Sequence, residues 1–363
     1  DISLYDYPEN INGNNITNSS NQFAFSGGST GFNSNVSGNK WWNHWTQESG
    51  GVSQGIVGNL LTNSGYPQLS SQITSLDKSG NLGYLFGGSS NSDYGINAYE
   101  DLNYLFQYDA STGYYTYDSS KNFATIYDAN GNYNDGNFIV YSDPNSGTSS
   151  GSTGHPYFLP FNQPGTNEEN ADYHFGMKIT VDDFLMPRDG KINNQDMTFS
   201  FAGDDDVWVY IDGVLILDMG GIHDSNSGNI NFGTGIVTVD KVYYEDGTSK
   251  NNSQSTAYIG DLLYAAKSGD QEWISANLEQ RTTESETHWY LKDYTTHDLS
   301  FFYLERGAVD SNCKIEFNLY TLQRNSITVG KELDTTTGTT EEMNNWLGNL
   351  EYTFRVLTQE ANA

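Results

Sequence analysis

Short runs in which apolar and polar residues alternate recur along the chain, separated by turn-forming residues. The clearest run is 197–218, where Val207, Val209 and Ile211 occupy alternate positions. Asp212 and Gly213 follow directly and are typical of a tight hairpin. A period of two places successive side chains on opposite faces of a strand. The same pattern predicts strands at 114–117, 123–127, 138–141, 236–239, 299–304 and 314–322, so we expect an all-β sandwich or barrel.

Helical spacing of apolar residues is scarce, and we predict short helices only near 56–61 and 99–106. The residue pattern changes near 323–326, and a new strand is predicted at 327–333. We therefore predict a first domain at 1–323, with a long loop-rich N-terminal insertion, and a second unit at 324–363. About 40 residues are too few to bury a sizeable core alone.

The net charge of −30, from 46 acidic and 16 basic residues, limits the classes of partner that we expect. Such a field repels nucleic acid and anionic lipid, and it favours cations. The 26 tyrosines and 38 glycines are typical of a β-rich extracellular protein. A single cysteine, Cys313, excludes an intrachain disulfide, and its alternation with Ile315 and Phe317 predicts a buried position on a strand.

Asp204, Asp205 and Asp206 form the most informative group of polar residues, directly before a strand that we expect to be half-buried. Adjacent carboxylates disfavour joint ionisation unless a cation compensates them, and Ca²⁺ prefers oxygen ligands of this kind. The alternative is that all three point into water at the end of the strand. The segment 128–132 matches only part of an EF-hand loop. No zinc-protease or phosphate-loop motif occurs.

Aromatic residues offer a second kind of candidate site. Trp41, Trp42 and Trp45 form the densest aromatic cluster, either as core or as a platform for sugar rings. Trp208 adjoins the aspartates, with its side chain opposite the Val207 and Val209 face, either as a surface stacking plane or in a second buried layer.

A family resemblance rests on long motifs in the first domain. They are GDDDVWVYIDG at 203–213, LDMGGIH at 217–223, SGNINF at 227–232, YHFGM at 173–177, HDLSFFYLERGA at 297–308 and SNCKIEFNL at 311–319. Over roughly residues 1–322 the chain resembles the fibro-slime branch of the anthrax protective-antigen-like domain family. The resemblance implies a lectin-like β-sandwich.

The resemblance also implies a set of site residues. In lectin members of the family, two consecutive aspartates joined by a cis peptide chelate calcium, and Asp204 and Asp205 match that pair. A second loop, matched by 305–312, implies Glu305 and Asn312 as further metal ligands. Glu305 stands where the lectins often place asparagine, so it either ligates calcium or pairs with Arg306. The ligand is then expected over the metal, beside Trp208, His223, Asn226 and Arg306.

The tail resembles the start of a collagen-adhesin B-type stalk repeat, which implies a partial immunoglobulin-like module at 324–363. Lys331 matches the lysine of an internal isopeptide bond, and Glu351 matches the buried acid that promotes it. The strand that carries the bonding partner has no match in this chain.

Together these features predict the head of an adhesin anchored to the cell wall of a Gram-positive bacterium, binding carbohydrate through Ca²⁺ and lacking enzymatic activity. The expected partner is a glycan or glycoprotein on another cell or matrix, and the expected form is a monomeric head on a multidomain stalk. One alternative is a structural or protein-binding tip with a purely structural calcium. A less favoured alternative is a glycoside hydrolase that uses carboxylates in the N-terminal insertion.

Overall fold

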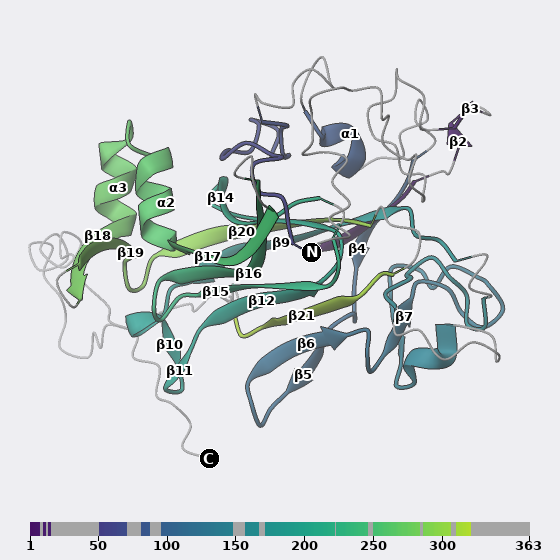
Figure 1. Cartoon of the computed structure of the whole chain (residues 1–363). Helices are drawn as coiled ribbons and strands as arrows, with labels where there is room; N and C mark the ends of the chain where they lie inside the picture. Colours follow the sequence, from purple (N-terminus) through teal and green to yellow (C-terminus); the bar gives the residue numbers. More distant parts are fainter. Residues whose placement is uncertain are drawn as a thin grey trace, which may run out of the picture. The chain divides into compact units, whose positions relative to one another are not determined.

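The fold is known from a computed structural model of the chain (Figure 1). It describes residues 1–7, 10–11, 14–15, 51–70, 81–87, 96–147, 157–166, 171–221, 223–245, 250–283, 286–305 and 310–320. The chain forms two compact units, Asp1–Leu322 and Gln323–Ala363. Lys331 and Glu351 in the second unit, and Trp41, Trp42 and Trp45 in the first, lie outside the described residues. The stalk repeat and the isopeptide bond therefore stay predictions.

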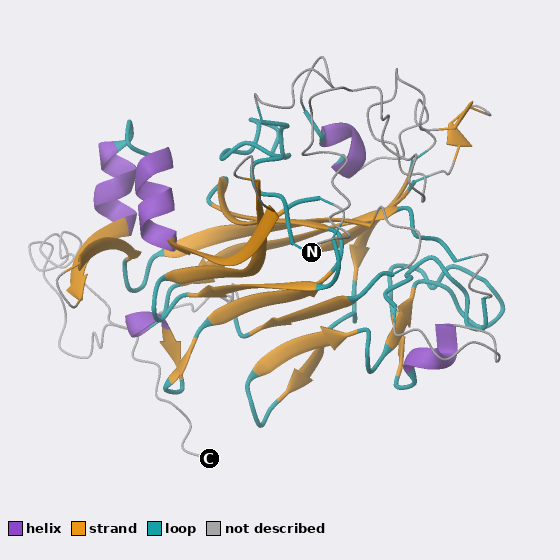
Figure 2. Cartoon of the chain, viewed as in Figure 1, coloured by secondary structure: helices purple, strands orange, loops and turns teal. Residues whose placement is uncertain are grey.

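Two antiparallel sheets make up the first unit and confirm the predicted all-β class (Figure 2). The six-stranded sheet has the order β14 (Val214–Met219), β13 (Asp206–Ile211), β20 (Thr296–Glu305), β9 (Phe175–Leu185), β1 (Ile2–Asp6) and β4 (Asn97–Leu102). The seven-stranded sheet has the order β17 (Lys250–Tyr258), β16 (Ile236–Glu245), β15 (Asn226–Asn231), β12 (Thr198–Gly203), β21 (Cys313–Phe317), β6 (Tyr114–Asp118) and β5 (Gln107–Asp109).

Smaller elements decorate this sandwich. The two-stranded sheets are β2 (Asn10–Ile11) with β3 (Asn14–Asn15), β7 (Phe123–Thr125) with β8 (Ile139–Tyr141), β10 (Lys191–Ile192) with β11 (Gln195–Asp196), and β18 (Leu278–Thr283) with β19 (Glu286–Leu291). The helices of the described segments are α1 (Gly83–Phe86), α2 (Ile259–Ala266), α3 (Gln271–Asn277) and the 3₁₀ turns Pro144–Gly147 and Arg188–Gly190. Within the described residues, no helix is long and apolar enough to cross a lipid bilayer.

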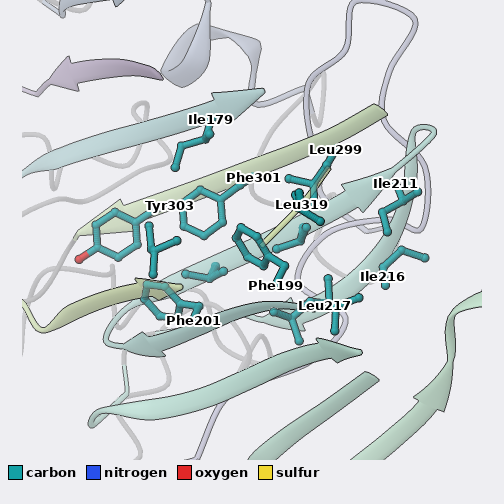
Figure 3. Packing of buried hydrophobic residues seen from close by; sticks show 14 of the residues in the cluster. Ile179, Phe199, Phe201, Ile211, Ile216, Leu217, Leu299, Phe301, Tyr303 and Leu319 are labelled. Carbon is teal, nitrogen blue, oxygen red and sulfur yellow. The ribbon is translucent and has the colours of Figure 1, made fainter. Parts of the chain in front are cut away.

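Between the two sheets lies the main core, built from the inward-facing residue of each alternating pair (Figure 3). Phe199 and Phe201 of β12 meet Phe301 of β20 with ring centroids 5.8 and 6.0 Å apart. Cys313 is buried in the same core, as its alternation predicted. Burial of aromatic side chains supplies most of the stabilisation in such a core, because each removes a large apolar area from water.

A second core covers the opposite face of the six-stranded sheet. Trp208 and Tyr210 of β13 and Phe302 of β20 pack there against Ile56 and Phe86. Every residue of β13 is therefore buried, and the expectation of a half-buried strand is wrong. The physical reason is that described parts of the N-terminal insertion lie over this face, so both sets of alternating side chains are shielded from water.

The predicted strands within the described residues correspond to observed ones, although β21 ends at Phe317, and the strand predicted at 327–333 lies outside the described residues. The predicted helices do not correspond to observed ones. The Asp212–Gly213 turn joins β13 to β14 with φ of 49° and 76°, as a tight hairpin requires. Residues 97–102 form β4 and pair with β1, and 56–61 form no helix. The helices α2 and α3 arise instead between β17 and β18, in a segment for which no helix was predicted.

Candidate cation site at the Asp204–Asp205 bond

Asp204 and Asp205 form the connection between β12 and β13, which belong to different sheets. The peptide bond between them is cis, as the family resemblance implied. Gly203 ends β12 in close contact with the backbone of Asn312. A Cβ added at Gly203 would lie 2.0 Å from the Asn312 carbonyl oxygen. The turn therefore packs directly against the 310–312 segment.

This contact predicts the effect of a single methyl group. We expect Gly203→Ala to destabilise the protein by about 1–3 kcal/mol, because the Asn312 backbone must move to admit the Cβ. Gly58→Ala is the matched control, since a Cβ there meets only Gln68 O at an ordinary 3.7 Å. Urea unfolding of the two variants measures the difference. Equal stabilities would contradict the tight packing of the 310–312 segment on this turn.

Four carboxyl groups are buried around this turn. Asp204, Asp205, Asp206 and Glu305 are exposed by only 3%, 2%, 0% and 0%. The aspartates come from the connection and the start of β13, whereas Glu305 ends β20, whose Leu304 pairs with Asp206. Sequence analysis brought Asp204, Asp205, Glu305 and Asn312 to one site, and the structure places them near each other. It does not test whether they bind a metal.

Two loops donate hydrogen bonds to these aspartates. Asn312 donates from its backbone N–H to Asp204 Oδ1 and from Nδ2 to Asp204 Oδ2, the latter over 3.0 Å. In the 219–226 loop, Gly221 N donates to Asp206 Oδ1 over 2.6 Å, and His223 N donates to Asp205 Oδ1 over 3.3 Å. Asn312 and the segment that contains Gly221 and His223 therefore both contact the aspartates directly.

Burial dominates the electrostatics of the site. It raises the pKa of Asp204 to about 7, although the hydrogen bonds from Asn312 act in the opposite direction. Burial also raises the pKa of Glu305 well above its ordinary value, and the nearby charges of Asp205 and Asp204 raise it further. Tyr303 donates its hydroxyl proton to Glu305 Oε2 over 2.8 Å. These carboxyl groups are close enough to repel one another when ionised.

The donor set fits a hard divalent cation in its chemistry. Carboxylate and amide oxygens are the ligands that Ca²⁺ prefers. A cation would also offset the cost of burying several negative charges together. No group of three or more His, Cys, Asp or Glu side chains in the described part of the chain forms a ready metal-binding cluster. Asp204, Asp205 and Glu305 would thus have to reorient around an ion, with Asn312 holding Asp204.

The residues predicted to contact a ligand have different surroundings. Trp208 is fully buried in the second core, so the suggestion of a surface stacking plane is wrong. Asn226 uses its amide to bind the backbone of Lys241 on β16, through Nδ2–O of 2.7 Å and N–Oδ1 of 3.1 Å. This braces the start of β15. Arg306 lies outside the described residues.

His223 is buried beside the aspartates, with an exposed fraction of 2%. Its Nδ1 donates to the Asp224 carbonyl oxygen over 2.8 Å, and Nε2 has no hydrogen-bond partner. Burial lowers the pKa of His223, so the ring is neutral at pH 7 and Nε2 carries a lone pair. His223 therefore stabilises the loop through Nδ1, and Nε2 is available as a hydrogen-bond acceptor.

Asp218 is a carboxylate that sequence analysis did not single out. Burial raises its pKa to about 7, and Gly55 N donates to its Oδ2 over 2.7 Å. It lies in register with Trp208 across β13 and β14. The single aspartate in an otherwise apolar strand, Val214–Met219, was a signal of this position.

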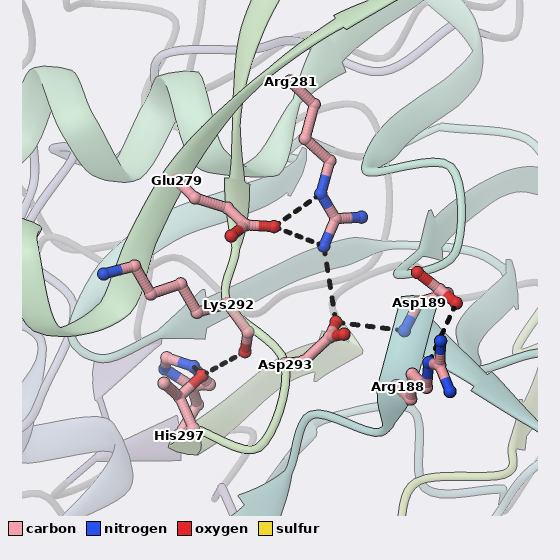
Figure 4. Close-up of polar contacts among 8 residues, drawn as sticks. Arg188, Asp189, Glu279, Arg281, Lys292, Asp293 and His297 are labelled. Atoms are coloured by element: carbon pink, nitrogen blue, oxygen red, sulfur yellow. Dashed lines mark hydrogen bonds and ion pairs between the residues drawn. The ribbon is translucent and has the colours of Figure 1, made fainter.

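A hydroxyl, an imidazole and a carboxylate also line up near the start of β20, around the His297 side chain that Figure 4 labels. Thr295 Oγ1 is 2.7 Å from His297 Nε2, and His297 Nδ1 is 2.6 Å from Asp212 Oδ2. The spacing resembles that of a nucleophilic triad. However, Thr295 donates its proton to the Lys292 carbonyl oxygen over 2.6 Å, and His297 is buried. The group therefore ties the β13–β14 hairpin to β20 and is not arranged to activate a nucleophile.

The ion pairs nearby reinforce this structural role (Figure 4). Arg281 of β18 contacts Glu279 over 2.7 Å and Asp293 over 3.3 Å. Asp293 in turn accepts from the backbone of Asp189 over 3.0 Å. These contacts join the β18–β19 hairpin to the 3₁₀ turn that follows β9.

Comparison with known proteins relates this chain to psi proteins of Dictyostelium discoideum. It is 28% identical to protein psiK over 235 residues, which are 61% of this chain and 29% of psiK. It is 29% identical to protein psiF over 102 residues, 28% of this chain and 13% of psiF. Protein psiR is 58% identical over a short stretch of 33 residues. The matches thus span less than a third of each relative. No family model and no solved structure matches.

These relatives correct two predictions. They belong to a eukaryote, so the prediction of a Gram-positive, cell-wall-anchored surface protein is wrong. For the same reason the prediction of a bacterial adhesin head that binds carbohydrate through calcium is wrong, since the similarity is to psi proteins. The all-β fold is confirmed, and the observed sequence similarity is to psi proteins.

Proposed function

We propose that the chain is a non-enzymatic binding module of a larger protein, with a structural Ca²⁺ that joins the Asp204–Asp205 turn to the end of β20. The observation that carries the proposal is the burial of Asp204, Asp205 and Glu305 beside one another. They come from the turn between β12 and β13 and from β20, so an ion held by all three would link both sheets.

The protein's own groups have distinct parts in this proposal. Asn312 orients Asp204 through two N–H groups, and Tyr303 orients Glu305 through its hydroxyl. The His223 backbone N–H contacts Asp205 and couples the 219–226 loop to the turn. When bound, Ca²⁺ would supply positive charge and would be coordinated by the carboxylate oxygens of Asp204, Asp205 and Glu305. The loops that it fixes are the usual position of recognition residues on a rigid sandwich.

The finer family resemblance supports the same assignment. Calcium bound by two consecutive aspartates is a feature of protective-antigen-like lectin domains, and Asp204 and Asp205 match that pair. A role as one module of a larger protein agrees with the partial coverage of psiK and psiF. A catalytic role for the carboxyl groups is disfavoured, because at 3% exposure or less they offer no surface to a substrate.

Calorimetric titration with CaCl₂ tests the proposal. We expect wild-type protein to bind one ion, and a free concentration of 100 times Kd to stabilise the fold by about 2.7 kcal/mol. Asp204→Asn and Glu305→Gln should weaken binding at least tenfold, because each removes a charged ligand. Asp182→Asn, an exposed position on β9, is the matched control and should bind as wild type.

Circular dichroism establishes that each variant is folded before titration. Folded Asp204→Asn that binds Ca²⁺ as tightly as wild type would refute the assignment. Failure of the wild type to bind would refute the structural calcium altogether.

A further inference from the structure

A row of aromatic residues leaves the core and runs to the free edge of the seven-stranded sheet. Phe199 of β12 pairs with Phe317 of β21, Phe317 with Tyr115 of β6, and Tyr115 with Tyr108 of β5. Successive ring centroids are 6.2, 5.5 and 4.8 Å apart. Direct cross-strand partners share one face of a sheet, so the row continues the inner, core-facing side.

Exposure rises along this row. Phe199 is buried and Phe317 is partly buried, whereas Tyr115 and Tyr108 are exposed by 41% and 57%. Among the described strands, β5 is the last of its sheet, and Figure 1 shows it at the lower margin of the sandwich. A terminal strand leaves a row of backbone N–H and C=O groups unpaired by a neighbouring strand. The aromatic row therefore ends at a strand edge that no other described strand pairs with.

The two outer strands at this edge contain acidic residues and no lysine or arginine. The acidic residues are Asp109 on β5 and Asp118 at the end of β6, and Asp118 pairs with Lys121 over 3.3 Å. Asp109 lies on β5 next to Tyr108, and an exposed strand alternates its side chains between faces. A complementary ligand would place apolar side chains on the tyrosine face and basic ones on the other. The net charge of −30 opposes self-association through this edge.

We propose that the β5 edge binds an extended, basic peptide segment of a partner protein as an eighth strand of this sheet. Main-chain hydrogen bonds to β5 would supply affinity, as in other cases of strand addition. An apolar side chain of the peptide would stack on Tyr108 and prolong the aromatic row. The proposal rests on the role as a binding module and names its partner class, but it does not involve the calcium site.

The test uses a fluorescent eight-residue peptide that alternates lysine with valine or phenylalanine. Its control has the same side chains and charge, with the alternate backbone nitrogens methylated. We expect micromolar binding of the first peptide and at least tenfold weaker binding of the second, because methylation removes strand pairing. Tyr108→Ser and Tyr115→Ser should each weaken binding at least tenfold. Tyr294→Ser, which is 66% exposed outside the row, should not.

Equal binding of both peptides would show simple charge attraction and overturn the proposal. Lack of binding would also overturn it, as would a dimer in sedimentation that Tyr108→Ser dissociates. Each titration is run with Ca²⁺ and with chelator. If the peptide fails to bind while Ca²⁺ still binds, the strand-addition proposal is refuted and the proposed cation site is not.

Discussion

Trp208→Ala should destabilise the protein by about 3–5 kcal/mol, the range for removing a large buried aromatic side chain. The indole packs in the second core, between the six-stranded sheet and the residues around Ile56 and Phe86. Its loss would open a cavity that the surrounding strands fill only in part. Urea denaturation followed by circular dichroism measures the change.

Trp289→Ala is the matched control, because Trp289 is only half-buried and stacks on Tyr264 at 4.4 Å. Its effect should be clearly smaller. A loss below about 1 kcal/mol for Trp208→Ala would contradict the account in which the insertion covers this sheet face.

The stability of the metal-free protein should fall as pH rises from about 4 to 7. The folded pKa of Asp204 is about 7, compared with 3.8 for the unfolded chain, so the folded state binds the proton more tightly in this window. A shift of this size corresponds to a loss on the order of 4 kcal/mol at neutral pH. Glu305, whose pKa is also raised, acts in the same direction.

Calcium should reverse much of this dependence, because it binds the ionised carboxylates and its affinity rises with pH through about 7. Thermal unfolding between pH 5 and 8, with Ca²⁺ and with chelator, measures both effects. Asp218 has a pKa near 7 as well and lies outside the proposed ligand set, so Asp218→Asn should reduce the metal-free slope and keep the calcium effect. Parallel profiles with and without calcium would contradict the assignment.

Sequence patterns predicted much of the sheet framework because strand alternation is a local property. The run 207–211 appeared as β13, and Asp212–Gly213 appeared as its hairpin turn. Alternation does not say whether the second face of a strand is covered, so the environment of Trp208 stayed open until the insertion was placed. The segment 99–106 has helix-like spacing, but pairing with β1 makes its first part a strand.

The candidate site was predictable to the extent that motifs define it. Asp204, Asp205, Glu305 and Asn312 came from motif matches, and the fold places them at one end of the sandwich. The hydrogen bonds of Asn226 to the Lys241 backbone could not be predicted, because this partner is distant in sequence and depends on the pairing of β15 and β16. The Gly221 contact to Asp206 likewise depends on tertiary structure.

A crystal structure of the protein grown with Ca²⁺, with an anomalous difference map, tests the cation site most directly. The account predicts a peak at bonding distance from carboxylate oxygens of Asp204, Asp205 and Glu305, with Asn312 still contacting Asp204. The matching crystal of Asp204→Asn should lack the peak. A map without density at this turn, or with calcium bound only at surface carboxylates, would contradict the claim that these buried groups form a calcium site.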